Sequence, residues 1–368
     1  MSELHSQLLV VFLNMQTSDF DYNLPDDRIA QSPVEPRDSS KLMIVDKKNK
    51  TTEHRHFFDI IEYLKPGDLI VWNNSKVFKA RLFGTLTDSN DDVLLDHTKQ
   101  VEVFLIRAMQ NTGVWQVLAK PGKHVKNGMR VRFGHDFYCD VVAKEPTGTI
   151  LVQFGELSEE QVRERANKYG RVPLPPYVKD ERHELEAYQN TYARADKEGS
   201  VAAPTAGFHF TDALIEKMKV KGVEFTEVTL HVGLGTFLPV KTEKVEDHTM
   251  HAEVVEISEE TVQKIKAAKA SGRRVIAVGT TTVRTLEGVH HLQGGLRAYH
   301  GDLNIFITPG FEFGVVDALI TNFHLPKSTL LMLVSAFAGD REFMLECYKK
   351  AVEKKYRFYS FGDAMFIC

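Results

Sequence analysis

The most regular pattern along the chain is a series of short apolar runs in its second quarter, separated by turn residues. Glycine-containing dipeptides such as Pro121-Gly122 and Asn127-Gly128 stand between the runs. Short apolar runs bounded by turn signals are typical of β-strands. These runs occupy 69–72, 101–106, 114–119, 129–133, 137–142 and 149–154. Because no helical periodicity interrupts them, the sequence predicts a small all-β domain, a barrel or a sandwich, inserted at residues 68–155.

The pattern changes after Gly155, where amphipathic helical segments alternate with apolar strands. Ser158 begins a capping box, and Gly170 stands where a helix would end. Further helices are predicted over 211–222, 258–270 and about 340–355, and strands over 42–45, 223–230, 275–278, 303–308 and 316–321. Helices that alternate with apolar strands indicate α/β layers. We therefore predict an α/β fold, a large mixed α/β domain built from both chain ends, 17–67 and 156–368.

The first 16 residues differ from the rest, with an apolar run from Leu8 to Leu13. A signal peptide begins with a basic segment, but this one contains Glu3 and neither lysine nor arginine before the run. The sequence favours a disordered extension over 1–16, with the folded domain opening near Met15.

Composition narrows the class of protein further. The 368 residues are 43% hydrophobic and 26% charged, which is enough apolar material for sizeable cores. Three cysteines without a CxxC pair exclude a disulfide framework and favour a reducing compartment. No apolar run approaches the roughly 20 residues that span a bilayer, so we expect a cytoplasmic protein without a membrane partner. The net charge of −4 excludes a generally basic nucleic-acid coat.

The strongest local signal for chemistry is VIAVGTTTVRTLE at 275–287, where a strand reaches Gly279 and three threonines lead into a helix. Free N–H groups at a helix N-terminus, together with threonine hydroxyls, can hold an anion or a carboxylate. An ordinary helix start explains the same residues equally well. Neither GxGxxG nor GxxxxGK[ST] occurs, so the dinucleotide and P-loop fingerprints are absent.

Histidines beside small residues mark further candidate pocket segments. They occur in APTAGFHFT (203–211), LHVGLGTF (230–237) and TNFHLPKSTLLM (321–332). Histidine is the usual general acid or base near neutral pH. The alternatives are a histidine hydrogen-bonded within a tight loop and, after 328, an ordinary capped buried helix. His248, His251 and Glu253 resemble half of a metal site, but the spacing is not HExxH and no third ligand cluster accompanies them, so no metal is predicted.

Basic residues without acids form a hairpin at 118–134 of the β domain. They are Lys120, Lys123, Lys126, Arg130 and Arg132. Such a cluster can follow the phosphates of a nucleic acid. A second stretch without acids, 72–83, adds Lys76, Lys79 and Arg81. A solvated basic edge strand is the alternative, since charge on an edge deters aggregation.

Several long segments resemble the S-adenosylmethionine:tRNA ribosyltransferase-isomerase family of the queuosine pathway. They are 199–211, 228–240, 277–287, 316–339 and 356–366, and 18–33, 81–84, 119–123 and 172–178 match in the same order. The resemblance covers about residues 17–367. It departs at 72–84, where Asn74, Lys76 and Lys79 stand in place of an acid, an arginine and a proline.

The resemblance implies an α/β domain with an inserted small β-barrel. It also implies that the ribosyl moiety of S-adenosylmethionine is transferred to tRNA bearing 7-aminomethyl-7-deazaguanine at the wobble position and is isomerised there. Epoxyqueuosine-tRNA, adenine and methionine would be the products. S-adenosylmethionine is then a consumed substrate, and neither a prosthetic group nor a metal is expected. We expect a monomer.

The resemblance and the residue types together suggest roles. Acid or base candidates are His209, His231 and His324, and Glu287 or Asp317 is expected near the sulfonium or a ribose. Substrate-binding candidates are Thr205, Gly207, Gly233, Gly235, Gly279, Thr280, Thr281, Thr282, Arg284 and Lys327. The tRNA-binding candidates are Lys120, Lys123, Lys126, Arg130 and Arg132. Two other functions compete, an S-adenosylmethionine-dependent RNA methyltransferase and a non-catalytic RNA-binding protein.

Overall fold

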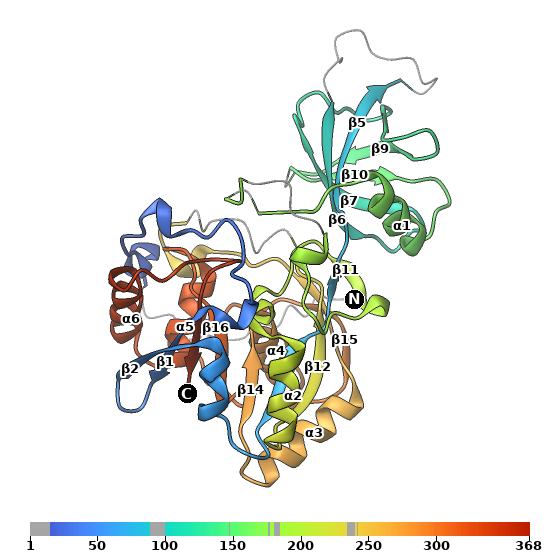
Figure 1. Ribbon diagram of the computed structural model, residues 1–368. Coiled ribbons are helices and arrows are strands. Elements are labelled where there is room, and N and C mark those ends of the chain that lie inside the picture. Colours follow the sequence, from blue (N-terminus) through green and yellow to red (C-terminus); the bar gives the residue numbers. More distant parts are fainter. Residues whose placement is uncertain are drawn as a thin grey trace.

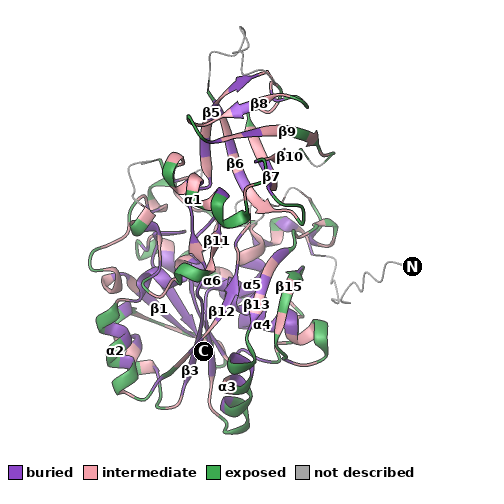
Figure 2. Ribbon diagram, turned by 90° about the vertical axis from the view of Figure 1, so that its right-hand side faces the viewer, coloured by how far each residue is buried: buried purple, intermediate pink, exposed green. Residues whose placement is uncertain are grey.

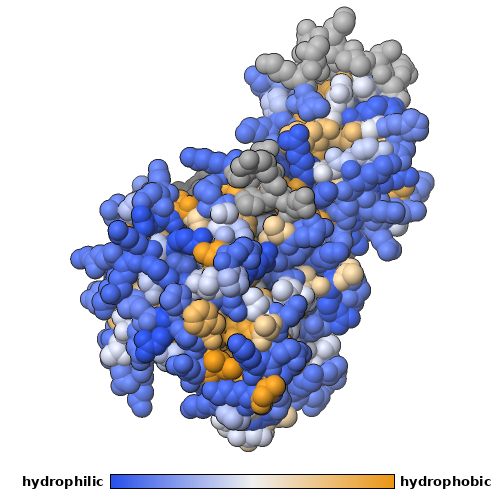
Figure 3. All heavy atoms as spheres, viewed as in Figure 1, coloured by the Kyte–Doolittle hydropathy of each residue, from blue (hydrophilic) through white to orange (hydrophobic). Residues whose placement is uncertain are grey.

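The computed structural model describes residues 15–88, 100–146, 148–175, 177–179, 185–233, 240 and 242–368. A small barrel stands on one end of a larger layered domain (Figure 1). The face seen in Figure 3 is mainly hydrophilic, with a few hydrophobic groups over the larger domain. Among the described residues, no helix combines the length and apolar character needed to cross a membrane.

The larger domain is built on a nine-stranded sheet. In spatial order the strands are β15 (Tyr299–Leu303), β13 (Glu253–Ile257), β12 (Glu224–Leu230), β3 (Leu69–Asn73), β14 (Val275–Val278), β16 (Ala318–Asn322), β17 (Ala364–Ile367), β1 (Lys41–Asp46) and β2 (Thr51–His56). The central strands β12, β3, β14 and β16 run parallel to their neighbours within this group. Strands from both chain ends therefore share one sheet, and the predicted mixed α/β fold is confirmed.

Both faces of this sheet are covered, which explains the continuous apolar runs of its central strands. In β1, Leu42 and Ile44 face one hydrophobic cluster, whereas Met43 and Val45 face another. The first cluster includes side chains of α2 (Asp212–Val220). The second includes side chains of α3 (Glu259–Ala270), α4 (Thr280–Gln293), α5 (Thr329–Ala338) and α6 (Arg341–Glu353). Figure 2 shows the buried strands between the exposed outer surfaces of α2 and α3.

Side-chain caps mark where most of the α-helices begin. In five of them, the residue before the helix accepts a hydrogen bond from a backbone N–H in the first turn. These capping residues are Ser158 for α1 (Glu159–Tyr169), Thr211 for α2, Ser258 for α3, Ser328 for α5 and Asp340 for α6. The short 3-10 helices are η1 (Thr17–Phe20), η2 (Asp26–Arg28), η3 (Arg37–Ser39), η4 (Phe57–Tyr63), η5 (Leu185–Tyr188), η6 (Ala195–Lys197), η7 (Thr205–His209) and η9 (Val245–Asp247).

The smaller unit is a closed antiparallel barrel. Its strands are β5 (Arg81–Thr87), β6 (Val101–Ala108), β7 (Val114–Lys120), β8 (Arg130–Arg132), β9 (Tyr138–Lys144) and β10 (Ile150–Gln153). Alternate side chains of these strands fill the interior, including Val103, Trp115 and Val117. A short parallel pair, β4 (Lys76–Val77) and β11 (Glu198–Ser200), joins the two units.

The structure shifts both predicted edges of the inserted domain. The run at 69–72 becomes β3 in the large sheet, because a strand buried on both faces also reads as a short apolar run. On the other side, α1 (Glu159–Tyr169) packs Val162 and Ala166 into the barrel core. The barrel unit thus begins after β4 and includes the helix that the sequence assigned to the larger domain.

Two smaller expectations also differ from the structure. Met15 is buried in the main core and Gln16 bridges to Lys244, so both belong to the fold and not to the predicted extension. The rest of that extension, 1–14, lies outside the described residues. The strand predicted at 303–308 instead ends at Leu303, and β15 extends back to Tyr299.

Candidate active site

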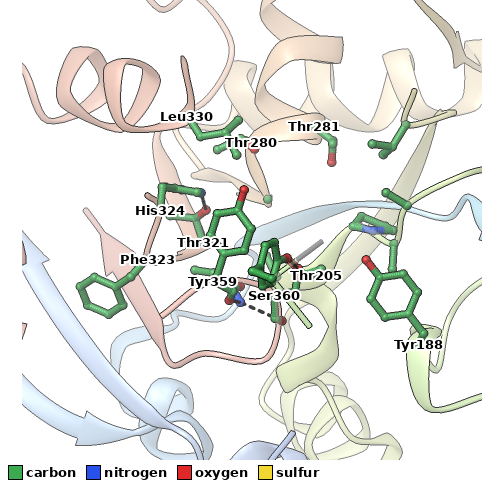
Figure 4. Close-up of a pocket in the computed structure, with 18 residues that line it drawn as sticks. Tyr188, Thr205, Thr280, Thr281, Thr321, Phe323, His324, Leu330, Tyr359 and Ser360 are labelled. Atoms are coloured by element: carbon green, nitrogen blue, oxygen red, sulfur yellow. Dashed lines mark hydrogen bonds between the residues drawn. The ribbon is translucent and has the colours of Figure 1, made fainter. Parts of the chain in front are cut away.

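A cavity opens where β14 and β16 end, at the carboxyl edge of the parallel strands. Ligands of α/β sheets bind at this edge. The barrel is inserted after β3 at the same end of the sheet (Figure 1). The cavity holds about 600 Å³ of empty space, part of it open to solvent. Figure 4 shows its lining, which is Tyr177, Tyr188, Ala202, Ala203, Pro204, Thr205, Ala206, Val232, Gly279, Thr280, Thr281, Thr321, Asn322, Phe323, His324, Leu330, Tyr359 and Ser360.

The lining of this cavity is uncharged. None of the described residues that form it is an aspartate, glutamate, lysine or arginine. Aromatic rings are contributed by Tyr177, Tyr188, Phe323 and Tyr359, and threonine, serine and asparagine supply neutral hydrogen-bonding groups. An apolar pocket with a few converging polar groups suits a flat, neutral ring system.

The strand-to-helix turn at Gly279 forms one wall. Gly279 has a positive φ of 84°, a conformation that glycine adopts easily, and its N–H donates to the Ile320 carbonyl. Unlike the other α-helices described above, α4 begins without a side-chain cap. Thr280 and Thr281 line the cavity, and the buried Thr281 hydroxyl has no partner among the described residues. Thr282 instead donates to the Val278 carbonyl and supports the turn.

His324 is the predicted histidine that lines the cavity. Its Nδ1 lies 3.1 Å from the Tyr348 hydroxyl, and its Nε2 lies 3.4 Å from Thr321 Oγ1. The Tyr348 oxygen also accepts the His324 backbone N–H. Burial lowers the pKa of His324 to about 3, so the imidazole is neutral near pH 7.

His209 lies behind the cavity wall, outside the lining. Its Nδ1 is 2.7 Å from Ser40 Oγ, and its Nε2 is 3.3 Å from Asn322 Oδ1. Burial lowers its pKa to about 4. The structure therefore links His209 to the cavity through Asn322, which does line it.

His231 follows β12 and is not part of the cavity lining. Its buried Nδ1 has no partner among the described residues, and its ring approaches Gly199 so closely that a Cβ there would lie 3.0 Å from it. Burial lowers the pKa of His231 to about 4. The structure does not bring His231 together with His324.

The two predicted carboxylates are also away from the cavity. Glu287 is fully buried and accepts the backbone N–H groups of Gly314, Val315 and Val316. Asp317 precedes β16 and therefore lies at the opposite end of that strand from Thr321 and Asn322. It pairs with Lys269 at 2.8 Å and accepts the Val275 N–H.

Two predicted cationic ligands have partners of their own. The buried Arg284 pairs with the buried Glu253, which also accepts the Gly233 N–H at 3.2 Å. Lys327 is about half exposed and pairs with Asp21 at 2.8 Å. Neither cation lines the cavity. The Arg284–Glu253 pair links α4 to β13 and to the residue that follows Val232.

Of the remaining candidates with small side chains, one lines the cavity and the other described ones do not. Thr205 begins η7 and lines the cavity. Gly207 lies in the same 3-10 helix, where a Cβ would come within 2.0 Å of the Tyr192 hydroxyl, so it permits close packing. Gly233 lies just beyond the lining residue Val232, and Gly235 lies outside the described residues.

The basic residues of 118–134 lie on the barrel, but the predicted hairpin is wrong. Strands β7 and β8 each pair with other strands, so this basic segment (118–134) connects two strands that are not neighbours. Lys120, Lys123 and Lys126 are exposed, and no described carboxylate pairs with them. Arg130 pairs with Asp140 at 2.7 Å and lies 4.0 Å from the centre of the Tyr138 ring, while Arg132 donates to the His135 carbonyl. In the second basic stretch, 72–83, two of the three cations form ion pairs, Lys76–Glu198 and Arg81–Glu102.

Asn74 and the possible metal half-site have structural partners. Asn74 is buried and accepts a hydrogen bond from Thr229 Oγ1 at 2.8 Å. His248 packs against Phe306, and Glu253 is engaged by Arg284. Among the described residues, no group of three histidine, cysteine, aspartate or glutamate side chains is arranged to hold a metal.

Sequence reasoning missed several lining residues, chiefly Tyr177, Tyr188, Asn322, Tyr359 and Ser360. The segments 172–178, 316–339 and 356–366 had been noted for their family resemblance. Only their common position around the end of β16 shows that their polar and aromatic side chains form one wall.

Comparison with known proteins identifies the family. A model described as "Queuosine biosynthesis protein" matches residues 17–367. Proteins named S-adenosylmethionine:tRNA ribosyltransferase-isomerase from Thermotoga petrophila and Thermosipho melanesiensis are each 50% identical over 353 residues, covering 96% of this chain and 100% of the relative. The crystal structure of S-adenosylmethionine tRNA ribosyltransferase from Thermotoga maritima matches with a TM-score of 0.54 and 40% identity, covering 95% of this chain and 100% of that chain. The chain therefore belongs to the queuosine biosynthesis protein family, together with these ribosyltransferase-isomerases.

Proposed function

We propose that the protein transfers the ribosyl moiety of S-adenosylmethionine to 7-aminomethyl-7-deazaguanine at the wobble position of tRNA and isomerises it there. The products are epoxyqueuosine-tRNA, adenine and methionine. The observation that carries this proposal is 50% identity to ribosyltransferase-isomerases over their whole length. An uncharged cavity at the carboxyl edge of the sheet, close to the inserted barrel, supports it.

The cavity suits the donor. Its aromatic rings and neutral polar groups fit adenine and ribose, which carry no charge. The uncapped start of α4 offers free N–H groups and the unpartnered Thr281 hydroxyl to the carboxylate of the methionyl group. We therefore assign Gly279, Thr280 and Thr281 to the donor, while Arg284 acts through its pairing with Glu253.

The reaction requires two proton transfers. A sulfonium acidifies the neighbouring C5′–H, which calls for a base, and adenine leaves more readily when it is protonated. His324 is the candidate for one of these transfers because it lines the cavity. Burial keeps its imidazole neutral, and its contact with Tyr348 fixes the orientation of the ring.

The tRNA is expected to contact the barrel. Lys120, Lys123 and Lys126 are exposed and unpaired among the described residues, so they can approach phosphates without first breaking an ion pair. Arg130 and Arg132 stack on Tyr138 beside them. The wobble base would leave its stack to reach the large domain, as bases recognised in single-stranded loops do. We further propose a cytoplasmic monomer without a prosthetic group.

A product assay tests this function. Purified protein is mixed with S-adenosylmethionine and tRNA bearing the aminomethyl-deazaguanine, and tRNA with an unmodified wobble base serves as the control. We expect free adenine and methionine in equal amounts, with a matching gain in tRNA mass, only for the modified tRNA. S-adenosylhomocysteine would instead indicate a methyltransferase. Binding of tRNA without any product would indicate a non-catalytic RNA-binding protein.

A further inference from the structure

Tyr359 combines two unusual features at the cavity. Its φ is +75°, in the left-handed region that a tyrosine rarely adopts. Its ring extends into the cavity beside Ser360 and Thr321 (Figure 4). Strained residues of this kind persist where the surrounding structure holds them, and they cluster at ligand sites.

A buried chain of hydrogen bonds holds Tyr359 in this conformation. Asn322 Nδ2 donates to the carbonyls of Tyr359 at 2.8 Å and Ser360 at 3.3 Å. Asn322 Oδ1 is contacted by His209, which in turn contacts Ser40. The Tyr359 N–H donates to the carbonyl of Phe323, so both sides of the peptide are fixed to the end of β16.

The direction of these hydrogen bonds determines which ring nitrogen of His209 carries the proton. Because Asn322 uses its amide nitrogen as the donor to two carbonyls, its Oδ1 remains an acceptor. His209 Nε2 must then carry the proton, and Nδ1 accepts from the Ser40 hydroxyl. His209 therefore supports the tyrosine turn from behind, as a neutral imidazole, and does not touch the cavity.

The side chain of Tyr359 is also restrained. The Tyr177 ring meets it edge to face, with centroids 3.9 Å apart and planes at 84°. The Tyr177 hydroxyl bonds to Ser360 Oγ. Tyr359 is nevertheless partly accessible, whereas Tyr188 is fully buried. A rigid aromatic ring with accessible surface in an uncharged cavity is suited to stacking on another flat ring.

We propose that Tyr359 is the surface on which the adenine ring of the donor stacks, and that His209 and Asn322 are positioning residues that hold it there. This inference rests on the proposed function. The absence of carboxylates from the described lining favours adenine over the deazaguanine of the tRNA. A guanine-like edge presents adjacent N–H donors that a carboxylate matches well, whereas adenine can be matched by neutral groups such as Asn322 and Thr205.

Direct binding measurements test the stacking. The dissociation constants of S-adenosylmethionine and of modified tRNA are measured by calorimetry for the wild type, Tyr359→Leu and Tyr359→Phe. Tyr63→Leu is the control, because Tyr63 ends η4 and does not line the cavity. Loss of a base stack corresponds to about tenfold weaker binding or more. We expect this loss for the donor with Tyr359→Leu, near-normal binding with Tyr359→Phe and Tyr63→Leu, and unchanged tRNA affinity throughout.

The outcomes separate this inference from the proposed function. If the wild type does not bind S-adenosylmethionine, the proposed function fails and the inference falls with it. If the wild type binds the donor and Tyr359→Leu binds it equally well, or loses tRNA affinity instead, only the inference is overturned. Tyr359→Gly supplies a second readout. It should bind the donor as weakly as Tyr359→Leu but melt at a higher temperature, because glycine relieves the positive φ.

Kinetics of His209 variants test the positioning role. His209→Leu cannot donate to Asn322, whereas the amide of His209→Gln can. We expect His209→Leu to raise the KM for the donor about tenfold with little change in kcat, and His209→Gln to restore most of the loss. A collapse of kcat at unchanged KM in both variants would make His209 a direct participant in proton transfer and overturn the assignment.

Discussion

The cavity of the large domain and the basic segment 118–134 of the barrel differ in almost every physical respect. The cavity is uncharged in its described lining, rich in aromatic rings and fixed by buried hydrogen bonds. The basic segment presents Lys120, Lys123 and Lys126, which are exposed and unpaired among the described residues. Contacts to phosphates weaken with added salt, whereas stacking and neutral hydrogen bonds respond little to it. The two regions should therefore respond to different perturbations.

The comparison also explains why each region has its own architecture. Proton transfer requires groups held within a few tenths of an ångström, and the ends of packed strands provide that rigidity. Phosphate contacts tolerate movement, because they depend on charge at longer range. A small barrel with long basic side chains is sufficient for them, and its insertion after β3 brings it to the cavity end of the sheet.

The largest effect is expected from His324→Ala. Removing a positioned acid or base lowers turnover by about 10²–10⁴-fold. Single-turnover kinetics should show this loss, while the affinities for donor and tRNA change little. His300→Ala on the exposed edge strand β15 is the matched control and should behave as the wild type. Near-normal turnover of His324→Ala would remove the chemical step from the cavity residues that we assign.

Charge reversal on the barrel should have the next largest effect. Lys123→Glu combined with Lys126→Glu should weaken tRNA binding about tenfold or more and reduce the salt slope by roughly 0.7–0.9 per lost phosphate contact. Donor affinity should stay unchanged. A double variant with the same change in net charge, Lys217→Glu with Lys266→Glu on α2 and α3, is the control. Equal losses in both double variants would assign the effect to net charge and not to the basic segment.

The pH dependence of stability should separate the two regions more subtly. His324 has a pKa of about 3 in the fold and about 6.5 when unfolded, so the unfolded chain binds more protons between these values. The stability that this neutral histidine contributes is present above about pH 6.5 and is lost as the pH falls towards 3.

Denaturant titrations of the wild type and His324→Gln measure this effect. The difference in their free energies of unfolding should shrink as the pH falls from about 6.5 to 4. The corresponding difference for the exposed Lys123→Gln should stay constant over the same range. A difference that does not depend on pH for His324→Gln would show that this histidine titrates normally in the fold.

The smallest effect is expected from Asp317→Asn. Asp317 lies at the opposite end of β16 from the cavity and pairs with the partly exposed Lys269. Loss of a pair of this kind costs about 0–1 kcal/mol of stability. We expect kcat and both KM values to remain close to wild type in steady-state assays. A large fall in kcat would reinstate the catalytic role that the sequence suggested.

The sequence predicted those features of the site that depend on local order. Gly279 and the threonines after it were found because a strand, a glycine and a helix start follow one another along the chain. The helix boundaries at Ser258 and Thr211 were predicted for the same reason, since caps are local signals.

Features that depend on contacts between distant segments were not predictable in this way. Nothing near Tyr359 indicates that Asn322 and His209 hold its turn, because these residues are brought together only by the packing of η7 and β16. Asp317 and Thr321 are only four residues apart, but the extended strand β16 places them at its two opposite ends. The apolar run of β3 was assigned to the barrel because burial on both faces leaves no alternation to distinguish it.

The most direct test of the account compares the salt dependence of the two binding steps. Dissociation constants of the wild type for S-adenosylmethionine and for modified tRNA are measured at about 50 and about 200 mM salt. Donor binding should change by less than about threefold, while tRNA binding should weaken by more than about tenfold. Parallel weakening of both would contradict the assignment of the donor to an uncharged cavity separate from the basic segment.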